Sequence, residues 1–173
     1  MKNNIKNLAK AKNKNIDDIC ICLLDRERHE HFIEDIKSLG AKLKLISDGD
    51  VAGSIFSALE TSDVDMYLGI GGAPEGVLAA SAIKCLGGQF QARLKIKDDD
   101  EIKRATNLGI KDFDKKYNLN DLVKGDVIFC SSGVTDGELV SGVKIKDKEY
   151  ETETFALHYS QKFFKKVKKK YKI

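Results

Sequence analysis

The chain of 173 residues is 42% hydrophobic and 33% charged, which is typical of one soluble globular domain and excludes a disordered or fibrous protein. No apolar run is long enough to span a membrane, and the first residues lack the apolar segment of a signal peptide, so we expect a cytoplasmic protein. The formal charge of +3 is uneven, because residues 161–173 carry seven lysines and no acids and leave the rest of the chain net acidic.

Helices and strands are predicted to alternate along the first half of the chain. The expected helices lie at residues 5–14, 32–39, 51–59 and 77–86, and apolar runs predict strands at 18–24, 42–46 and 66–70. These three strands are apolar enough to be buried on both faces. Strand–helix units in succession predict an α/β layer with a mainly parallel centre.

The second half of the chain is predicted to add antiparallel strands. The expected segments are a half-exposed strand at 89–94, charged helix and loop at 98–125, and strands at 127–131, 139–146 and 150–159. The Asp136-Gly137 turn is predicted to join two of these strands as a hairpin, and we interpret it as structural. The result is a mixed sheet flanked by helices.

We predict a single α/β domain over residues 1–160 and a lysine-rich tail over residues 161–173. The simplest interpretation of the tail is a solvated helix or frayed end that aids solubility. Lysine runs also attract nucleic acid and anionic membranes. We expect neither nucleic acid nor a membrane as a partner, and the tail receives no function.

Four cysteines are present, and two of them share one strand. Cys20 and Cys22 are two residues apart, so they point to one face of that strand. The spacing is not that of a zinc-binding pair, and no second pair follows. Buried reduced thiols are the expected role.

A glycine cluster follows the third predicted strand and leads into a helix that begins at Pro74. Proline is tolerated in a first helical turn, where its missing N–H has no partner, and the free N–H groups there attract anions. The order of the glycines fits neither a dinucleotide-binding nor a P-loop pattern. A structural turn explains the glycines but not Glu75, the only acid of that turn.

Charged residues also follow the first and second predicted strands. Arg26 and Arg28 would point the same way in an extended segment, where guanidinium groups suit a phosphate, although a solvated helix start explains them equally well. Asp48-Gly49-Asp50 offers carboxylates to sugar hydroxyls or a cation, yet Asp-Gly is also a common turn and Asp50 a possible helix cap.

Four segments in order resemble the class II fructose-1,6-bisphosphatases of the GlpX type. They are Leu24-Asp-Arg-Glu-Arg-His29, Lys44-Leu-Ile-Ser-Asp-Gly-Asp-Val-Ala52, Gly69-Ile-Gly-Gly-Ala-Pro-Glu-Gly-Val77 and Gly133-Val-Thr-Asp-Gly137. The resemblance covers roughly residues 5 to 146 and only the carboxy-terminal half of the family's chain. It implies one half of a layered α-β sugar-phosphatase fold.

The resemblance also implies roles for individual residues. Substrate would be bound by Arg26, Glu27, Arg28, Asp48, Gly49, Asp50 and Gly72, with Glu27 standing where the family usually has proline. Glu75 would bind a divalent metal, Mn²⁺ or Mg²⁺. His29 belongs to a matching motif, where orienting or capping is a better fit than ligation.

The implied function is hydrolysis of fructose 1,6-bisphosphate to fructose 6-phosphate and phosphate in gluconeogenesis. The family's amino-terminal half supplies most of the metal-binding acids, so this chain is predicted to be a fragment or a split part of the enzyme, inactive alone. The alternative is a non-catalytic sugar-phosphate-binding or regulatory module. The expected partners are the sugar bisphosphate and either a second copy or a separate amino-terminal half.

Overall fold

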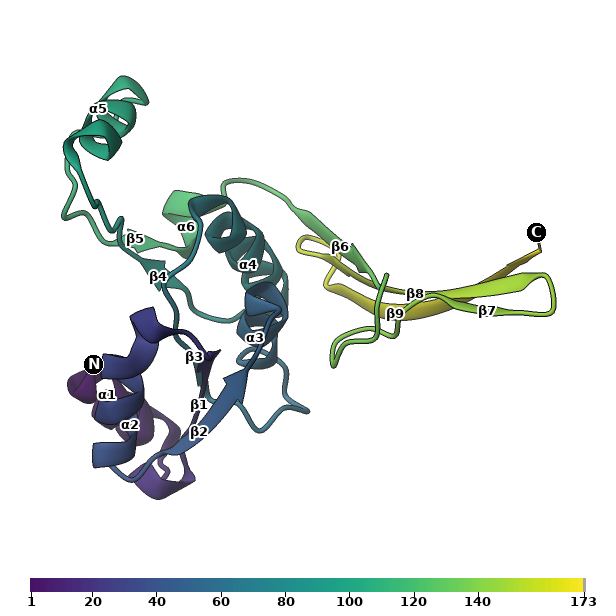
Figure 1. Ribbon diagram of the computed structural model, residues 1–173, viewed down its shortest axis with the longest axis horizontal. Coiled ribbons are helices and arrows are strands. Elements are labelled where there is room, and N and C mark those ends of the chain that lie inside the picture. The colour runs from purple at the N-terminus through teal and green to yellow at the C-terminus, as the bar shows by residue number, and fades with distance from the viewer. Residues whose placement is uncertain (173) are drawn as a thin grey trace.

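The computed structural model describes residues 1–172, and a three-stranded parallel sheet lies at its centre (Figure 1). Strand β1 (Cys20–Leu24) lies between β2 (Lys42–Ile46) and β3 (Met66–Tyr67). All residues of β1 are buried, whereas β2 and β3 are partly exposed because each has only one neighbour. The prediction that all three strands are buried on both faces is therefore correct only for β1.

Helices cover both faces of this sheet (Figure 1). They are α1 (Lys2–Lys12), α2 (Glu30–Ser38), α3 (Asp50–Phe56) and α4 (Ala73–Leu86), with 3₁₀ turns η1 (Ile16–Asp18) and η2 (Glu27–His29). Ile21 and Leu23 face α1 and α2 in one core, and Cys20 and Cys22 face α3 in another. The predicted burial of the two thiols is confirmed. Burial raises the pKa of Cys22 to about 11, so its thiol stays protonated at neutral pH.

A smaller region links this unit to the rest of the chain. It contains β4 (Gln91–Ala92) paired with β5 (Tyr117–Asn118), α5 (Asp99–Asn107) and α6 (Leu119–Leu122). Only two residues of the strand predicted at 89–94 are paired, and α5 stands away from the sheet (Figure 1).

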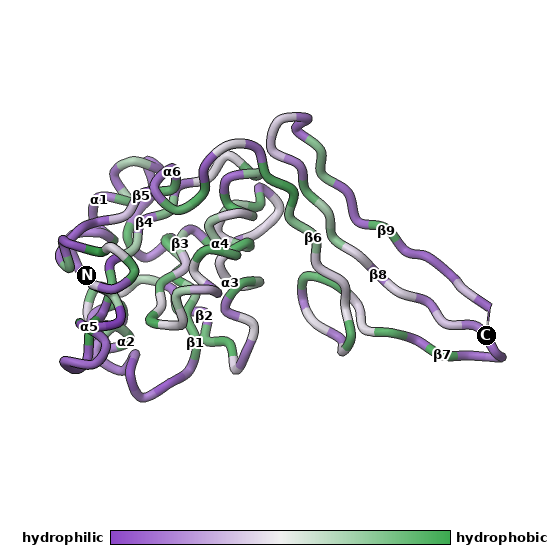
Figure 2. The backbone as a smooth tube through the Cα atoms, turned by 90° about the horizontal axis from the view of Figure 1, so that it is seen from above, coloured by the Kyte–Doolittle hydropathy of each residue, from purple (hydrophilic) through white to green (hydrophobic). Residues whose placement is uncertain are grey.

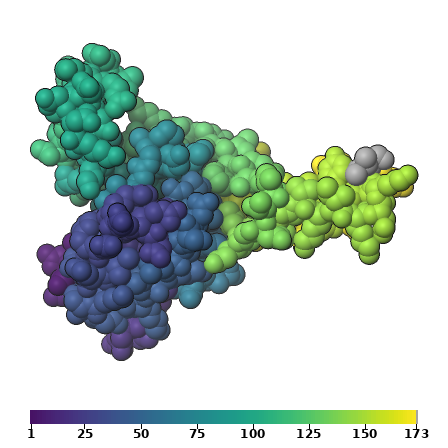
Figure 3. Space-filling model, viewed as in Figure 1, coloured from purple at the N-terminus to yellow at the C-terminus, as the bar shows by residue number. Residues whose placement is uncertain are grey.

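An antiparallel sheet projects from the body of the molecule as an arm (Figures 1 and 3). We use the word arm for β6 (Ile128–Ser132), β7 (Lys144–Lys146), β8 (Glu149–His158) and β9 (Phe163–Lys172). Strand β8 pairs with β9 along its whole length and with β6 and β7 near its two ends. The prediction of an α/β fold with a parallel sheet, antiparallel additions and flanking helices is confirmed.

The hairpin predicted in the arm is wrong. Strands β6 and β7 pair with β8 and not with each other, so Asp136-Gly137 does not join them as a hairpin. The loop between them instead bonds to itself, with the Gly137 N–H donating to Val140 O at 3.0 Å and the Val143 N–H to Val134 O at 3.1 Å.

The lysine-rich segment is a strand and neither a helix nor a frayed end. The register of β8 and β9 places Glu149, Glu151 and Glu153 opposite Lys172, Lys170 and Lys168. Opposite charges in directly facing positions favour strand pairing. Figure 2 shows how hydrophilic most of β9 is, which explains why no apolar pattern predicted it. In residues 1–172, no helix has the length and apolar character needed to cross a membrane.

Candidate functional site

Three loops meet at one edge of the central sheet because its strands are parallel. The loops follow β1, β2 and β3 and contain the charged motifs predicted from the sequence. Ligands of open α/β sheets bind at the carboxyl ends of strands. The order β2–β1–β3 places the arginine loop between the other two.

His29 fastens two of these loops together. Its side chain is fully buried, and its Nε2 accepts a hydrogen bond from the Ile70 N–H at 2.9 Å. Because Nε2 is the acceptor, Nδ1 carries the proton and donates to Leu24 O at 2.8 Å. The histidine therefore orients the loop after β3 against the end of β1, which fits the orienting role expected from its motif.

Arg26 and Arg28 reach in different directions along the edge of the sheet. Arg26 donates to Asp25 O and Ser47 O, both at 2.7 Å, whereas Arg28 Nε donates to Ile70 O at 2.7 Å. The expected extended segment is wrong, because residues 27–29 form the turn η2. The two guanidinium groups nevertheless stay at this edge, each bonded to the loop that follows a neighbouring strand.

The Asp48-Gly49-Asp50 turn is built around a left-handed glycine. Gly49 has φ 82° and occupies the N-cap of α3, so the suggestion that Asp50 caps this helix is wrong. Asp50 lies in the first helical turn, where its Oδ1 accepts the Val51 N–H at 2.9 Å. Its Oδ2 approaches Gly71, where an added Cβ would lie 3.4 Å from it. The second and third loops thus lie close together at this point.

Glu75 folds back over Gly72 at the start of α4. Gly72 is the N-cap of this helix and Pro74 lies in its first turn, as the sequence predicts. A Cβ at Gly72 would collide with Glu75 Oε2, so only glycine allows the carboxylate to take this position. Glu75, Gly72 and the turn around Asp50 therefore form one acidic corner of the edge.

Tyr67 lies under the same corner and was not predicted as a site residue. Its ring packs directly against Gly53 and Gly69, which have no side chain. A Cβ added at Gly53 would lie 2.8 Å from Tyr67 Cε2, and one added at Gly69 would lie 3.1 Å from the Tyr67 hydroxyl. Burial, together with the nearby Asp50 carboxylate, raises the pKa of Tyr67 well above its usual value. The hydroxyl therefore stays protonated and is available as a donor.

A hollow of about 630 Å³ separates the turn after β2 from the loop between β6 and β7. It is lined by residues 45–49, Ala52, Phe56 and residues 131–140. The pair Lys44 Nζ–Glu138 Oε2, at 2.6 Å, bridges its two walls. Asp136 uses Oδ1 to accept the Gly142 N–H at 2.9 Å, which supports the structural role predicted for it.

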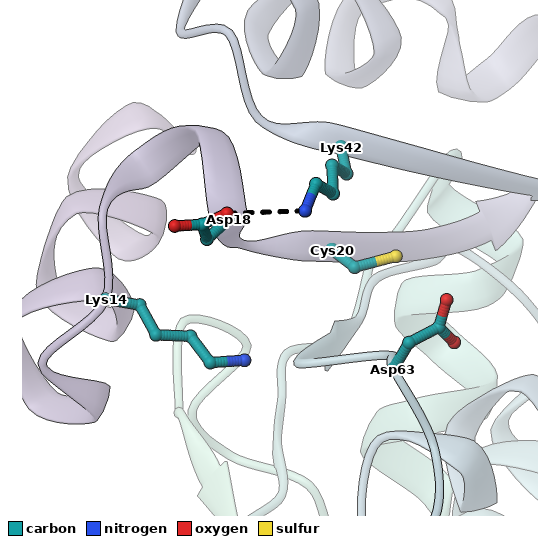
Figure 4. A pocket seen from close by; sticks show the side chains of 5 residues that line it. All are labelled: Lys14, Asp18, Cys20, Lys42 and Asp63. Carbon is teal, nitrogen blue, oxygen red and sulfur yellow. Dashed lines mark hydrogen bonds and ion pairs between the residues drawn. The ribbon is translucent and has the colours of Figure 1, made fainter.

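No group of three or more His, Cys, Asp or Glu side chains in residues 1–172 is arranged to hold a metal ion. Glu75 alone does not fit the Mg²⁺ or Mn²⁺ chemistry implied by the resemblance, since such ions require several oxygen ligands. A second hollow lies at the opposite, amino end of β1 and is lined by Lys14, Asp18, Cys20, Lys42 and Asp63 (Figure 4). It is remote from the three loops and contributes nothing to their site.

A serine, a histidine and an aspartate also meet at the root of the arm. Asp126 Oδ2 lies 2.8 Å from His158 Nε2, and Ser160 Oγ lies 3.3 Å from the same nitrogen. A proton relay needs the acid and the nucleophile on different ring nitrogens, so this group is not a catalytic triad. Hydrogen bonds from Ser160 and His158 hold the pKa of Asp126 far below its usual value.

This chain is similar in sequence to several known proteins. The family described as bacterial fructose-1,6-bisphosphatase, glpX-encoded, matches residues 1–171. The fructose-1,6-bisphosphatase class 2 of Haemophilus influenzae is 38% identical over 96% of this chain and 54% of its own length. The D-fructose 1,6-bisphosphatase class 2/sedoheptulose 1,7-bisphosphatase of Synechocystis sp. is 38% identical over 82% of this chain and 45% of its own length.

A third relative carries the same description and comes from Trichodesmium erythraeum. It is 34% identical over 92% of this chain and 50% of its own length. The chain thus spans about half the length of the curated relatives it matches. The family match also runs through β9, so the expectation that the similarity ends near residue 146 is wrong.

Proposed function

Because this chain belongs to the glpX-encoded family of bacterial fructose-1,6-bisphosphatases, we propose that it forms the substrate-binding half of a sugar-bisphosphate phosphatase. The substrate is fructose 1,6-bisphosphate, and the products are fructose 6-phosphate and phosphate. The observation that supports this proposal is the meeting of three charged loops at one edge of a parallel sheet. Two of these loops are joined by the hydrogen bonds of His29.

Different residues of the edge bind different parts of the substrate. Arg26 and Arg28 bind one phosphate, because each guanidinium keeps N–H donors beyond those bonded to backbone carbonyls. Asp48, Asp50 and the backbone at Gly49 accept and donate hydrogen bonds to the sugar hydroxyl groups. Glu27, which lies in η2 between the arginines, lines the same site.

The acidic corner is the part that this chain leaves incomplete. Gly72 offers its backbone to the substrate, and Glu75 contributes one carboxylate to a divalent metal, Mn²⁺ or Mg²⁺. The remaining ligands belong to the half of the family's length that this chain does not match. The isolated chain is therefore expected to bind the sugar bisphosphate and to release little or no phosphate, even with manganese.

Calorimetry with fructose 1,6-bisphosphate tests the binding role of the edge. Arg28→Ala should weaken binding by about 1.5–3 kcal/mol, the usual contribution of a charge-assisted hydrogen bond. Arg104→Ala, at an exposed position of α5, is the matched control and should bind like the unaltered chain. Equal affinity of all three proteins, with a lower melting temperature for Arg28→Ala, would assign Arg28 to the structure alone.

A non-catalytic sugar-phosphate-binding or regulatory module is the second candidate. It is favoured by the absence of a metal-holding acid cluster in residues 1–172. Adding the unmatched half of the family separates the two candidates. Phosphate release that appears with this half and is lost in Glu75→Gln would support the enzyme, and binding without release would support the module.

A further inference from the structure

The two faces of the arm's sheet have opposite characters. Residues of β8 alternate between the faces, and Phe155 and Leu157 are buried in a core with α3 and α4. We call this the inner face. The opposite, outer face carries apolar or aromatic side chains from β6, β7 and β9, namely Ile128, Cys130, Ile145, Phe163, Val167 and Tyr171.

The outer face is open to solvent along the arm. Ile128 is 68% exposed, Ile145 is 73% exposed and Phe163 is 42% exposed. Cys130 is an exposed free thiol between them on this face. Residues at the two ends of the arm, Ile128 on β6 and Ile145 on β7, therefore belong to one uncovered sheet surface.

Most charged residues of the arm's strands lie on the inner face of the sheet, and Lys165 and Lys169 are the exceptions. An antiparallel sheet normally turns its apolar residues to the core and its polar residues to solvent. Here Glu149, Glu151 and Glu153, with the lysines opposite them, share the inner face with Phe155. The outer face is thus the more apolar of the two, although Lys165 and Lys169 also lie on it, and its apolar side chains are exposed.

We propose that the outer face of the arm is the docking surface for the polypeptide that corresponds to the unmatched half of the family. The Haemophilus influenzae relative has nearly half its length outside the match, since this chain covers 54% of it. A contiguous apolar patch on a sheet is normally covered by a partner. The acidic corner has too few ligands, within residues 1–172, to hold a divalent metal, which gives an independent reason for this half to contact the chain.

A second copy of this chain fits the outer face less well. Lys165 and Lys169 of β9 lie on this face, opposite Ala156 and Thr152 of β8. The outer-face positions of β6, β7, β8 and β9 include no Asp or Glu, so a second copy would offer these ammonium groups no partner there, and unpaired charges in a desolvated interface weaken association. The proposal rests on family membership and does not depend on phosphatase activity.

The experiment combines the complete 173-residue chain with the unmatched half of the Haemophilus influenzae relative, produced as a separate polypeptide. The reporter is maleimide labelling of Cys130, with Cys130→Ser used to assign the signal. We expect a one-to-one complex by light scattering and labelling at least about tenfold slower than in the free chain, because a docked layer restricts access to local opening.

Two variants locate the contact. Ile128→Glu should weaken the complex at least about tenfold, since it places a charge without a partner in the covered surface. Leu108→Glu, at an 82% exposed position outside the arm, is the matched control and should leave the complex unchanged. Circular dichroism should show that both variants keep the fold of the unaltered chain.

The proposal would be overturned by no complex, or by a complex in which Cys130 is labelled at its free rate. It would also be overturned if Cys130 were already protected in a homodimer of the chain alone. None of these readouts involves the sugar bisphosphate, so failure here and failure of the proposed function are distinguishable.

Discussion

The parallel sheet β2–β1–β3 and the antiparallel sheet of the arm differ in how many of their faces are covered. Helices pack on both faces of the parallel sheet, which leaves its carboxyl edge as the exposed place for a ligand. The arm is covered on its inner face only, and only near its root. The comparison separates the two proposals, which assign the small-molecule site to the edge of one sheet and the polypeptide surface to a face of the other.

The two regions also differ in what stabilises them. Buried polar groups tie the parallel sheet together, with His29 at its carboxyl edge and Asp65 at its amino edge. The arm is held by an aromatic root, where Phe155 contacts Phe129 and Phe164, and by facing charges farther out. Substitutions should therefore lower stability through lost hydrogen bonds in the parallel sheet, and through lost packing or charge pairing in the arm.

The largest effect is expected at the root of the arm. Phe155→Ala removes a fully buried ring from the core shared with α3 and α4, and should lower the free energy of unfolding by about 3–5 kcal/mol. Urea denaturation followed by circular dichroism measures this change. Phe163→Ala, on the open outer face, is the control and should cost less than Phe155→Ala in the free chain.

The next largest effect is expected at His29, which joins two loops of the parallel sheet. His29→Ala leaves the Leu24 carbonyl and the Ile70 N–H without their partner, at a cost of about 2–4 kcal/mol. His31→Ala, at an exposed position of α2, should change stability by less than about 0.5 kcal/mol. The same denaturation experiment compares them, and equal stabilities would show that His29 does not hold the loops.

The sequence predicted the elements whose signals are local. The buried run of β1, the helix that begins near Pro74 and the charged loops after three strands all follow from neighbouring residues. The position of the Glu75 carboxylate against Gly72 could also have been predicted, because both residues lie within the same four-residue turn. The expected positions of the strands then brought the loops to one edge without any knowledge of distant contacts.

The features that the sequence did not predict depend on residues far apart in the chain. His29 bonds to Ile70, and Tyr67 fits into the space left by Gly53, neither of which has a local pattern. Strand β9 has lysines at positions where a strand is usually recognised by apolar residues. Its pairing is explained only by the glutamates that face it on β8. A charge pattern compared between the two segments, rather than within each, would have found it.

A smaller effect with a distinct pH dependence is expected at Asp65. Its carboxylate accepts hydrogen bonds from Lys12, Lys14 and the Cys20 N–H, at 2.7, 2.8 and 2.9 Å. Burial acts to raise the pKa of Asp65, but these bonds outweigh it and hold the pKa below its usual value. Asp65→Asn should therefore cost about 1.5–3 kcal/mol at neutral pH.

The pH dependence follows from the sign of this shift. A carboxyl with a lower pKa in the folded state stabilises the protein above its unfolded pKa of about 4, and this contribution is lost as the pH falls through the folded value. The difference in unfolding free energy between Asp65→Asn and the unaltered chain should stay constant from about pH 7 to 5 and narrow below about pH 4. A difference that does not change with pH would exclude this ionic role.

The smallest effect is expected for the facing charges of the arm. Glu151 and Lys170 lie opposite each other with 3.9 Å between Oε2 and Nζ, and the lysine side chain is 70% exposed. Such a pair contributes only about 0.2–1 kcal/mol, and salt screens it. Glu151→Lys should destabilise the arm by at least about this amount at low ionic strength, because it places a lysine opposite both Lys170 of β9 and Lys144 of β7.

The double variant Glu151→Lys with Lys170→Glu separates charge from packing. It restores opposite charges between β8 and β9 but leaves Lys144 of β7 facing a lysine, so its stability at low salt should lie between those of the single variant and the unaltered chain. In about 1 M salt, where the Debye length falls to about 3 Å, all three proteins should converge. If the single variant were as stable as the unaltered chain at low salt, the pairing of β8 with β9 would rest on backbone hydrogen bonds and the stacked Tyr150 and Tyr171 rings instead.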